Sequence, residues 1–298
     1  MLEFKQICAD DYERYNKYRA LDATYASEGV FATMFIWDKY YNLEVAENGE
    51  FFFIRFNIKG KEGAYFFPIG KGNLKKAVSE LWEYSKEKGE KLRFLLVSRE
   101  NADKLLELYP DNFSAEPDRN CFDYVYLTEK MITLSGKKLH SKRNHLNYFF
   151  ENYDYEYIEV KEKPLLEKCA KKAYALISAK TKNRNSFELG AMERYFENYF
   201  KFNQKGGAII IDGEIAAMTF GERLNGETAL IQIELADEKY RGAYQAINKL
   251  FCEKEWKDCL YVNREEDMGI EGLRKAKTSY QPEFLVEKYV INAFAKGD

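Results

Sequence analysis

The sequence predicts an α+β protein built from two similar halves, each a mixed β-sheet flanked by helices. Patterns typical of strands and helices run along the chain in one order and then repeat in that order. Apolar residues make up 46% and aromatic residues 16% of the 298 residues, enough for a core in each half. A glycine also stands at one strand-to-helix step in each half, Gly72 and Gly242. We therefore expect a duplication, with domains over residues 1–130 and 131–298.

The first half begins with patterns for a short strand, a polar helix and an apolar segment of undecided period, at 2–7, 9–21 and 31–37. Three closely spaced strands follow, and the turn-forming sequences between them predict a meander. A helix with Leu74, Val78 and Leu81 on one face comes next. The predicted strands are 42–46, 51–58, 64–68, 92–97, 112–117 and 121–127, and the helices are 70–86 and 101–108.

Residues 131–150 contain no Asp or Glu and hold four Lys or Arg residues and both histidines of the chain. A thin apolar stripe through Leu139 and Leu146 predicts one basic helix that connects the halves. His140 and His145 are five residues apart, about 140° around a helix, so they cannot share a metal ion on one face. We expect no metal site here.

The second half repeats the order with a strand at 155–160, helices at 165–179 and 187–202, and a second meander. Asp212-Gly213 and Asn225-Gly226 predict its two hairpin turns. The predicted meander strands are 207–211, 214–221 and 228–235; a helix entered at Gly242, a strand at 260–262, a helix at 270–276 and a strand at 282–289 follow.

Charge and cysteine content limit the classes of protein. Lys and Arg number 46 against 49 Asp and Glu, a net charge of −3, so any affinity for nucleic acid must be local. The five cysteines are scattered without a Cys-x-x-Cys pair, which fits reduced thiols and a cytoplasmic location. The sequence predicts no signal peptide and no membrane span, leaves peripheral membrane contact open, and does not fix the oligomeric state.

The strand at 228–235 carries the first candidate for catalysis. Its apolar residues alternate with Gln232 and Glu234, so an amide and a carboxylate share the opposite face. Glu234 is the candidate general base, and a solvated sheet edge is the alternative. The helix entered at Gly242 predicts a phosphate site, because a helix N-terminus presents backbone N–H groups and glycine permits close approach; a helix start without a ligand is the alternative.

This junction resembles the GNAT acyltransferase superfamily, which has a basic residue or Gln, two residues, Gly, one residue, then Gly or Ala. The sequence here is KYRGAY over 239–244, where Tyr244 replaces the second small residue. A more extensive resemblance rests on LHSKRNHL at 139–146, RGAYQAIN at 241–248, NREEDMG at 263–269, and LRKAK-x-SY-x-P at 273–282. These motifs are similar to the family of phosphatidylglycerol lysyltransferase C-terminal domains.

The resemblance implies two tandem GNAT-like domains and transfer of lysine from lysyl-tRNA, but it carries no lipid acceptor over to this chain. It implies Tyr280 as a proton donor, with a core tyrosine as the alternative. The candidate donor- or phosphate-binding residues are Arg241, Gly242, Ala243, Tyr244, Lys142, Arg143 and His145. The candidate substrate-binding residues are Gln232, Asn263, Arg264, Glu265 and Asp267. Internal ion pairs with Arg274 or Lys275 are the alternative for the acidic loop.

We therefore expect an aminoacyl transferase that moves an amino acid from aminoacyl-tRNA to an amine or hydroxyl, with tRNA bound through the basic helix. One alternative is an acyl-CoA-dependent N-acyltransferase. Another is a non-catalytic binding protein on the same fold. Each enzyme would use its donor as a co-substrate, and we expect no tightly bound cofactor.

Overall fold

The computed structural model describes residues 2–21, 24–180 and 186–294. The chain forms two compact units. Unit 1 comprises Met1–Phe122 together with Val286–Asp298, and unit 2 comprises Asp123–Leu285. This division differs from the predicted boundary between residues 130 and 131, because the C-terminal segment returns to the first unit.

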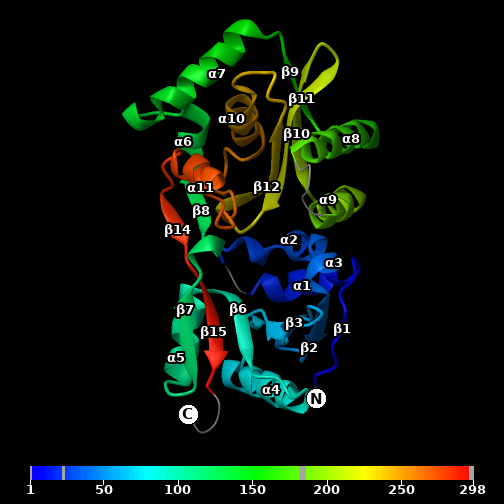
Figure 1. The fold of residues 1–298 in the computed structure, drawn as a ribbon, viewed down its shortest axis with the longest axis vertical. Helices are drawn as coiled ribbons and strands as arrows, with labels where there is room; N and C mark the ends of the chain where they lie inside the picture. The colour runs from blue at the N-terminus through cyan, green and yellow to red at the C-terminus, as the bar shows by residue number, and fades with distance from the viewer. Residues whose placement is uncertain (1, 22–23, 181–185, 295–298) are drawn as a thin grey trace. The chain divides into compact units, whose positions relative to one another are not determined.

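Unit 1 contains one mixed sheet with helices on both faces (Figure 1). Its strand order is β1-β2-β3-β4-β6-β15-β7, with β5 also paired to β3. The strands are β1 (Lys5–Gln6), β2 (Leu43–Glu47), β3 (Phe51–Phe56), β4 (Ala64–Tyr65), β5 (Ile69–Gly70), β6 (Arg93–Ser98), β7 (Phe113–Pro117) and β15 (Lys288–Ala293). The helices are α1 (Asp11–Arg19), η1 (Ser27–Gly29), α2 (Phe31–Ile36), α3 (Asp38–Tyr41), α4 (Leu74–Glu87), α5 (Arg99–Leu108) and η2 (Arg119–Cys121).

Every residue of β3 is buried, because both faces of this strand are covered. Phe52 packs edge-on against Tyr15 of α1, with ring centroids 5.6 Å apart. Phe51 and Phe53 point to the opposite face and belong to the core cluster that includes Val78 of α4. Alternate residues of a strand face opposite sides of a sheet, so a uniformly apolar strand requires cover on both.

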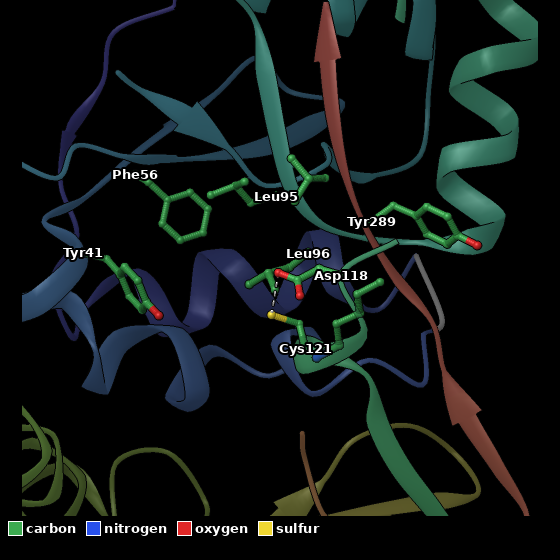
Figure 2. A pocket seen from close by; sticks show the side chains of 9 residues that line it. Tyr41, Phe56, Leu95, Leu96, Asp118, Cys121 and Tyr289 are labelled. Carbon is green, nitrogen blue, oxygen red and sulfur yellow. Dashed lines mark hydrogen bonds between the residues drawn. The ribbon is translucent and has the colours of Figure 1, made fainter. Parts of the chain in front are cut away.

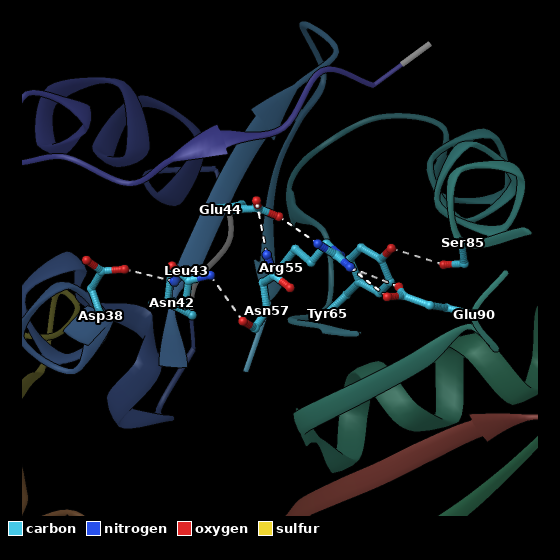
Figure 3. Close-up of polar contacts among 9 residues, drawn as sticks. All are labelled: Asp38, Asn42, Leu43, Glu44, Arg55, Asn57, Tyr65, Ser85 and Glu90. Carbon is cyan, nitrogen blue, oxygen red and sulfur yellow. Dashed lines mark hydrogen bonds and ion pairs between the residues drawn. The ribbon is translucent and has the colours of Figure 1, made fainter. Parts of the chain in front are cut away.

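A buried ion-pair network replaces apolar packing at the end of β3 (Figure 3). Arg55 is 5% exposed and lies 2.7 Å from Glu44 Oε2 and 2.8 Å from Glu90 Oε1. Beside it, Ser85 Oγ donates to the hydroxyl of Tyr65 over 3.1 Å, and burial raises the pKa of Tyr65 to about 12. The charge of Arg55 is retained in the interior because two carboxylates compensate for its lost hydration.

Unit 2 also contains one sheet, of order β14-β8-β13-β12-β11-β10-β9 (Figure 1). The strands are β8 (Asp123–Leu127), β9 (Glu156–Glu159), β10 (Lys205–Ile211), β11 (Glu214–Arg223), β12 (Thr228–Ala236), β13 (Tyr261–Asn263) and β14 (Phe284–Val286). The helices are α6 (Thr128–Thr133), η3 (Lys137–Leu139), α7 (His140–Asn152), α8 (Lys163–Lys180), α9 (Ser186–Asn198), α10 (Ala243–Glu255) and α11 (Glu271–Thr278). Among the described residues, no helix is long and apolar enough to cross a membrane.

Helix α10 packs on one face of the second sheet, and α8 and α9 lie on the other (Figure 1). Ala246, Ile247 and Phe251 of α10 are fully buried in the core of this unit. The predicted hairpin turn at Asp212-Gly213 is confirmed: both residues have positive φ, of 51° and 80°, as a two-residue turn of type I′ requires.

The basic stretch at 131–150 is not one helix, and that prediction is wrong. Helix α6 ends at Thr133 and α7 begins at His140. Leu134 has φ 48° and Gly136 has φ 96°, so the backbone leaves the right-handed helical region at these two residues. Arg143 donates from Nη1 to the carbonyl oxygens of both residues and stabilises the bend.

Each unit contains one strand that the sequence predicted for the other half. Strand β8 follows β7 in the chain, yet it pairs with β13 in the second sheet. The predicted strand at 282–289 is two strands, β14 in the second sheet and β15 in the first. β15 pairs with both β6 and β7. Alternation of residues predicts a strand but carries no information about its partner, so the predicted placement of both strands was wrong.

Candidate active site

The candidate site begins where the two parallel strands of unit 2 separate. β12 and β13 pair from Thr228 with Tyr261 through Leu230 with Asn263. β13 ends there, whereas β12 continues to Ala236. The polar side chains of β12 therefore lie beyond the end of its parallel partner, where a loop can reach them.

That loop, residues 264–270, is held by its own side chains. Asn263 Oδ1 accepts a hydrogen bond from the backbone N–H of Glu265 over 2.7 Å. Asp267 is fully buried and accepts hydrogen bonds from Arg274 through both Nε and Nη2, each over 2.8 Å. Tyr124 O–H donates to the same carboxylate over 2.7 Å. Burial acts to raise the pKa of Asp267, but the hydrogen bonds from Arg274 and Tyr124 outweigh it and hold that pKa well below its usual range.

Lys277 of α11 also holds the backbone of this loop. Its ammonium donates to the backbone carbonyls of Arg264, Glu265 and Glu266, with distances of 3.1 and 2.6 Å to the last two. Burial lowers the pKa of Lys277. Three carbonyl acceptors match the three donors of an ammonium group. The loop backbone beside Arg264 is therefore fixed.

The fixed loop directs Arg264 onto the polar face of β12. Arg264 Nη2 donates to Glu234 Oε1 over 2.7 Å, and the side chains are 13% and 11% exposed. The second carboxylate oxygen, Oε2, accepts from Nδ2 of Asn248 on α10 over 2.8 Å. Both oxygens of Glu234, the predicted candidate for the general base, therefore accept hydrogen bonds from donors within the protein.

Two tyrosines and a lysine surround the guanidinium of Arg264. Its Cζ lies 4.9 Å from the ring centroid of Tyr280 and 5.8 Å from that of Tyr126. Lys142 of α7 places Nζ 4.4 Å from the Tyr280 ring. Burial raises the pKa of Tyr280 to about 12, so its hydroxyl is protonated at neutral pH. Burial and then the nearby Arg264 charge lower the pKa of Lys142, although Glu234 opposes this.

One donor of this cluster is not used within the described part of the chain. Arg264 Nη1 is buried and has no hydrogen-bond partner there, nor does Oδ1 of Asn248. A buried donor without an acceptor costs about 1–3 kcal/mol, so such groups are rare in native proteins and often belong to functional sites. The site thus combines an unsatisfied cationic donor, a neutral phenol and a half-buried amine.

The remaining predicted substrate-binding residues have partners within the protein. Asn263 is fully buried and donates to Asp123 Oδ2 over 3.1 Å. Gln232 donates to Glu222 Oε1 over 3.2 Å. Glu265 has φ 56°, and its backbone carbonyl oxygen accepts a hydrogen bond from Lys277. Together with the Asp267–Arg274 pair, these contacts favour the internal-contact alternative for the loop over direct substrate binding.

The surroundings of Gly242 give this glycine a structural reason that is independent of the predicted phosphate site. A Cβ atom there would lie 2.1 Å from the backbone oxygen of His145 and 3.0 Å from Cβ of Phe149. Gly242 has φ 90°. The close neighbour that requires glycine is therefore α7, because the carbonyl oxygen of His145 lies beside Gly242.

The other predicted donor-binding residues lie in different surroundings. Lys142 reaches the Arg264 cluster, whereas Arg143 holds the bend before α7. Arg241 is exposed, with its guanidinium 4.4 Å from the Tyr148 ring centroid. The others are Ala243, fully buried; Tyr244, packed at the edge of the core; and His145, whose backbone contacts Gly242.

Sequence reasoning missed Asn248, Tyr126 and the role of Lys277. Asn248 offered a signal, because it is a polar residue on the buried face of a helix. Among the described residues, no group of three His, Cys, Asp or Glu side chains could hold a metal ion.

A known protein family matches most of this chain in sequence. The family described as "Phosphatidylglycerol lysyltransferase, C-terminal" matches residues 19–292. The chain belongs to this family. This confirms the resemblance to the phosphatidylglycerol lysyltransferase C-terminal family that the sequence motifs predicted.

Solved structures share the fold of this chain. A conserved protein of unknown function from Bacteroides thetaiotaomicron is 32% identical, with a TM-score of 0.91 over 99% of this chain and 100% of that chain. The C-terminal domain of a putative lysylphosphatidylglycerol synthetase from Agrobacterium fabrum is 16% identical, with a TM-score of 0.72 over 97% and 93% of the chains. The predicted fold, two tandem GNAT-like domains with mixed sheets flanked by helices, is confirmed.

A relative from Mycoplasmoides gallisepticum, described as an uncharacterized protein, is 26% identical over 192 residues. The match covers 57% of this chain and 55% of that relative, so the chain spans about half the length of this member.

Proposed function

We propose that this protein is an aminoacyl transferase that moves an amino acid from aminoacyl-tRNA to an amine or hydroxyl acceptor at the Arg264 cluster of unit 2. The observation that supports the proposal most is the buried Arg264 guanidinium, whose Nη1 has no hydrogen-bond partner among the residues that the structure describes. Acyl transfer from an ester generates negative charge on the carbonyl oxygen. A preorganised cationic donor in a site shielded from water stabilises that charge.

The proposed reaction exchanges one bond to the carbonyl carbon for another. The acceptor nitrogen or oxygen attacks the ester carbonyl, and the resulting oxyanion accepts a hydrogen bond from Arg264 Nη1. Lys142, when deprotonated, takes the proton of the acceptor. Collapse breaks the bond to the ribose oxygen, and Tyr280 gives that oxygen a proton. A proton passed from Lys142 to Tyr280 restores both groups, so atoms and charge balance.

The structure changes the role that we propose for Glu234. Its two oxygens accept from Arg264 and Asn248, so the carboxylate is engaged on both sides. We assign it to orient Arg264 and to compensate its charge. Lys142 takes the role of base, because it is half-buried and approaches the same tyrosine.

The contacts of Gly242 favour aminoacyl-tRNA over acyl-CoA as the donor. A pyrophosphate at the start of α10 would need the space and the positive potential there. The carbonyl oxygen of His145 takes up that space next to Gly242 and carries partial negative charge. An extended polyanion has other cations to contact, since Lys137, Lys138 and Arg241 are all exposed in or beside α7.

The experiment supplies the protein with each charged tRNA and, separately, with a set of acyl-CoAs, and follows loss of the donor ester or thioester. We expect turnover of an aminoacyl-tRNA that disappears in Arg264→Ala, with Arg223→Ala as a control far along the sheet. Turnover of an acyl-CoA alone would replace the proposal with the N-acyltransferase alternative. Binding of charged tRNA without turnover by any acceptor would support the non-catalytic alternative.

A further inference from the structure

Unit 1 contains a pocket of about 160 Å³ at an irregularity of its sheet (Figure 2). The register of β6 against β15 shifts, so Leu95 and Leu96 together lie opposite Val290 alone. This is a β-bulge, and Leu96 has φ 57°, a conformation that side chains other than glycine rarely adopt. All three residues of the bulge line the pocket. The backbone distortion and the pocket are therefore one feature.

The pocket lies at the position in unit 1 that corresponds to the Arg264 cluster in unit 2. In unit 2, Arg264 directly follows the last parallel pair, Leu230 with Asn263. In unit 1, the parallel strands β4 and β6 pair at Tyr65 with Phe94, and Leu95 and Leu96 follow directly. The duplicated fold thus places apolar side chains where unit 2 has a guanidinium. Unit 1 lacks the cationic donor for acyl transfer at this position but offers space for a ligand.

The walls of the pocket are mainly apolar. Leu95, Leu96, Val290 and the ring of Phe56 are among the lining residues, whereas the ring of Tyr289 points away from Leu95 and Leu96 (Figure 2). A cavity of about 150 Å³ with apolar walls accepts a benzene ring. The pocket therefore has room for one aromatic ring or a branched aliphatic group.

Its charged groups favour a cation. Lys288 is fully buried, and its ammonium is paired with Glu28 Oε1 at 2.7 Å and with Ser27 Oγ at 3.1 Å. The carboxylate of Asp118 accepts from the backbone of Asn120 over 3.2 Å and from the thiol of Cys121 over 3.3 Å. Each carboxylate oxygen can accept more than one hydrogen bond, so Asp118 retains capacity for an ammonium group.

We propose that unit 1 binds a small apolar amine, with its ring or branched chain in the bulge pocket and its ammonium group on Asp118. The ligand class is an aromatic or branched aliphatic primary amine. This site is separate from the reacting residues proposed in unit 2.

Cys121 provides a direct readout, because its sulfur lines the pocket beside Asp118 (Figure 2). Cys8 is exposed, whereas Cys169, Cys252 and Cys259 are buried. Burial raises the pKa of these three thiols, to about 12 for Cys169 and Cys252, so they react slowly. In a Cys8→Ser variant of the full chain, alkylation by N-ethylmaleimide therefore reports mainly on Cys121.

The test measures this alkylation rate against the concentration of benzylamine, benzyl alcohol and benzoate, which share a ring and differ in charge. We expect benzylamine to protect Cys121, benzyl alcohol to do so about tenfold more weakly, and benzoate not to protect. Asp118→Asn keeps the shape of the pocket and should weaken benzylamine by about tenfold while leaving benzyl alcohol unchanged. Leu95→Trp should abolish protection by filling the pocket, with circular dichroism confirming the fold.

The proposal would be overturned by no protection by benzylamine, by equal protection by benzoate, or by full affinity in Asp118→Asn. Binding of benzylamine and benzyl alcohol with equal affinity would also reject the ammonium site. Since Asp118→Asn does not alter the volume of the pocket, the proposal stays falsifiable if Leu95→Trp fails to fold. The readout uses neither tRNA nor Arg264, so its failure would leave the proposed transfer reaction untouched.

Discussion

Arg264 Nη2 donates to Glu234 Oε1 over 2.7 Å at the point where β12 extends past the end of β13. The two residues are 30 positions apart and meet because Asp267, Arg274 and Lys277 fix the loop between β13 and α11. The charged side chains Asp267, Arg274 and Lys277 thus serve mainly to place one guanidinium. Its second terminal nitrogen is the group that we expect to act on a substrate.

Replacing Arg264 tests that expectation. Arg264→Ala should lower kcat for aminoacyl transfer by about 10²–10³-fold, the usual effect of removing one oxyanion donor. Arg264→Lys should not restore the rate, because an ammonium cannot reach Glu234 and a substrate oxygen with two separate nitrogens. Steady-state kinetics with charged tRNA would measure both. A rise in KM alone, without loss of kcat, would contradict the role.

Glu234→Gln should lower kcat through Arg264 and not through proton transfer. The amide keeps the size of the carboxylate but no longer compensates the guanidinium charge. We therefore expect the double variant with Arg264→Ala to be no slower than Arg264→Ala alone, since residues that act as a unit are not additive. Additive losses in this cycle would indicate an independent catalytic role for Glu234.

Lys142 should control the pH dependence of the rate. Its folded pKa is lowered by burial and by Arg264, and a base must be deprotonated to act. The rate should therefore rise with pH through the folded pKa of Lys142, and Lys142→Met should be slow and lose this rise. Lys138→Met, at an exposed site beside α7, is the matched control and should keep the profile. An unchanged pH profile in Lys142→Met would remove Lys142 from the mechanism.

Asp267→Asn should destabilise unit 2 by about 2–3 kcal/mol at neutral pH, because the Arg274 and Tyr124 contacts lose a buried anion. The folded pKa of Asp267 lies below its ordinary 3.8, so its stabilisation is present above that pH and is lost as the pH falls further. Urea unfolding from pH 7 to pH 3 should show a smaller acid dependence in the variant. Asp258→Asn, in an exposed pair with Arg223, should change little.

Gly242→Ala should reveal whether α7 is what requires this glycine. The new Cβ would meet the His145 oxygen at 2.1 Å in a backbone with φ 90°, so we expect a loss of about 2–4 kcal/mol in the free energy of unfolding. Gly213→Ala is the control, because φ there is 80° and nothing lies within 4 Å of the added atom. Its loss should be about 1 kcal/mol, the backbone contribution alone. Equal losses would show that the contact with α7 is dispensable.

A chain that ends at Glu287 would test whether the sheet of unit 1 depends on β15. It keeps β14 but lacks β15, which pairs with both β6 and β7. We expect amide hydrogen exchange in β6 and β7 to become much faster, while β11 and β12 of unit 2 stay protected. A chain that ends at Phe294 keeps β15 and should match the full protein. Continued protection of β6 would show that the first sheet does not need this strand.

Most elements could be predicted from the sequence, because their patterns are local. Alternation in Ile231, Ile233 and Leu235 predicted β12, and glycine turns predicted the hairpins. The bend near Leu134 could not be predicted in this way. It depends on a leucine with positive φ that Arg143 stabilises from nine residues away.

Part of the site was also predictable. Tyr280, Lys142, Arg264 and Glu234 were all candidates, and the structure brings them into one cluster. Their mutual contacts were not predictable, because they depend on β12, α7 and the loop after β13 meeting in space. The position of Glu234 on a polar strand face does not indicate that Arg264 pairs with it.

The sequence by itself determined where most strands and helices form, that the chain has two domains with mixed sheets, and to which family it belongs, since periodicity and motifs are carried by neighbouring residues. Only the tertiary structure decided that β8 and β15 complete the sheets of the opposite halves, that Glu234 holds Arg264, and that α7 takes up the space at Gly242. Such contacts join residues up to about two hundred positions apart, and they are selected by packing and charge compensation across the whole fold.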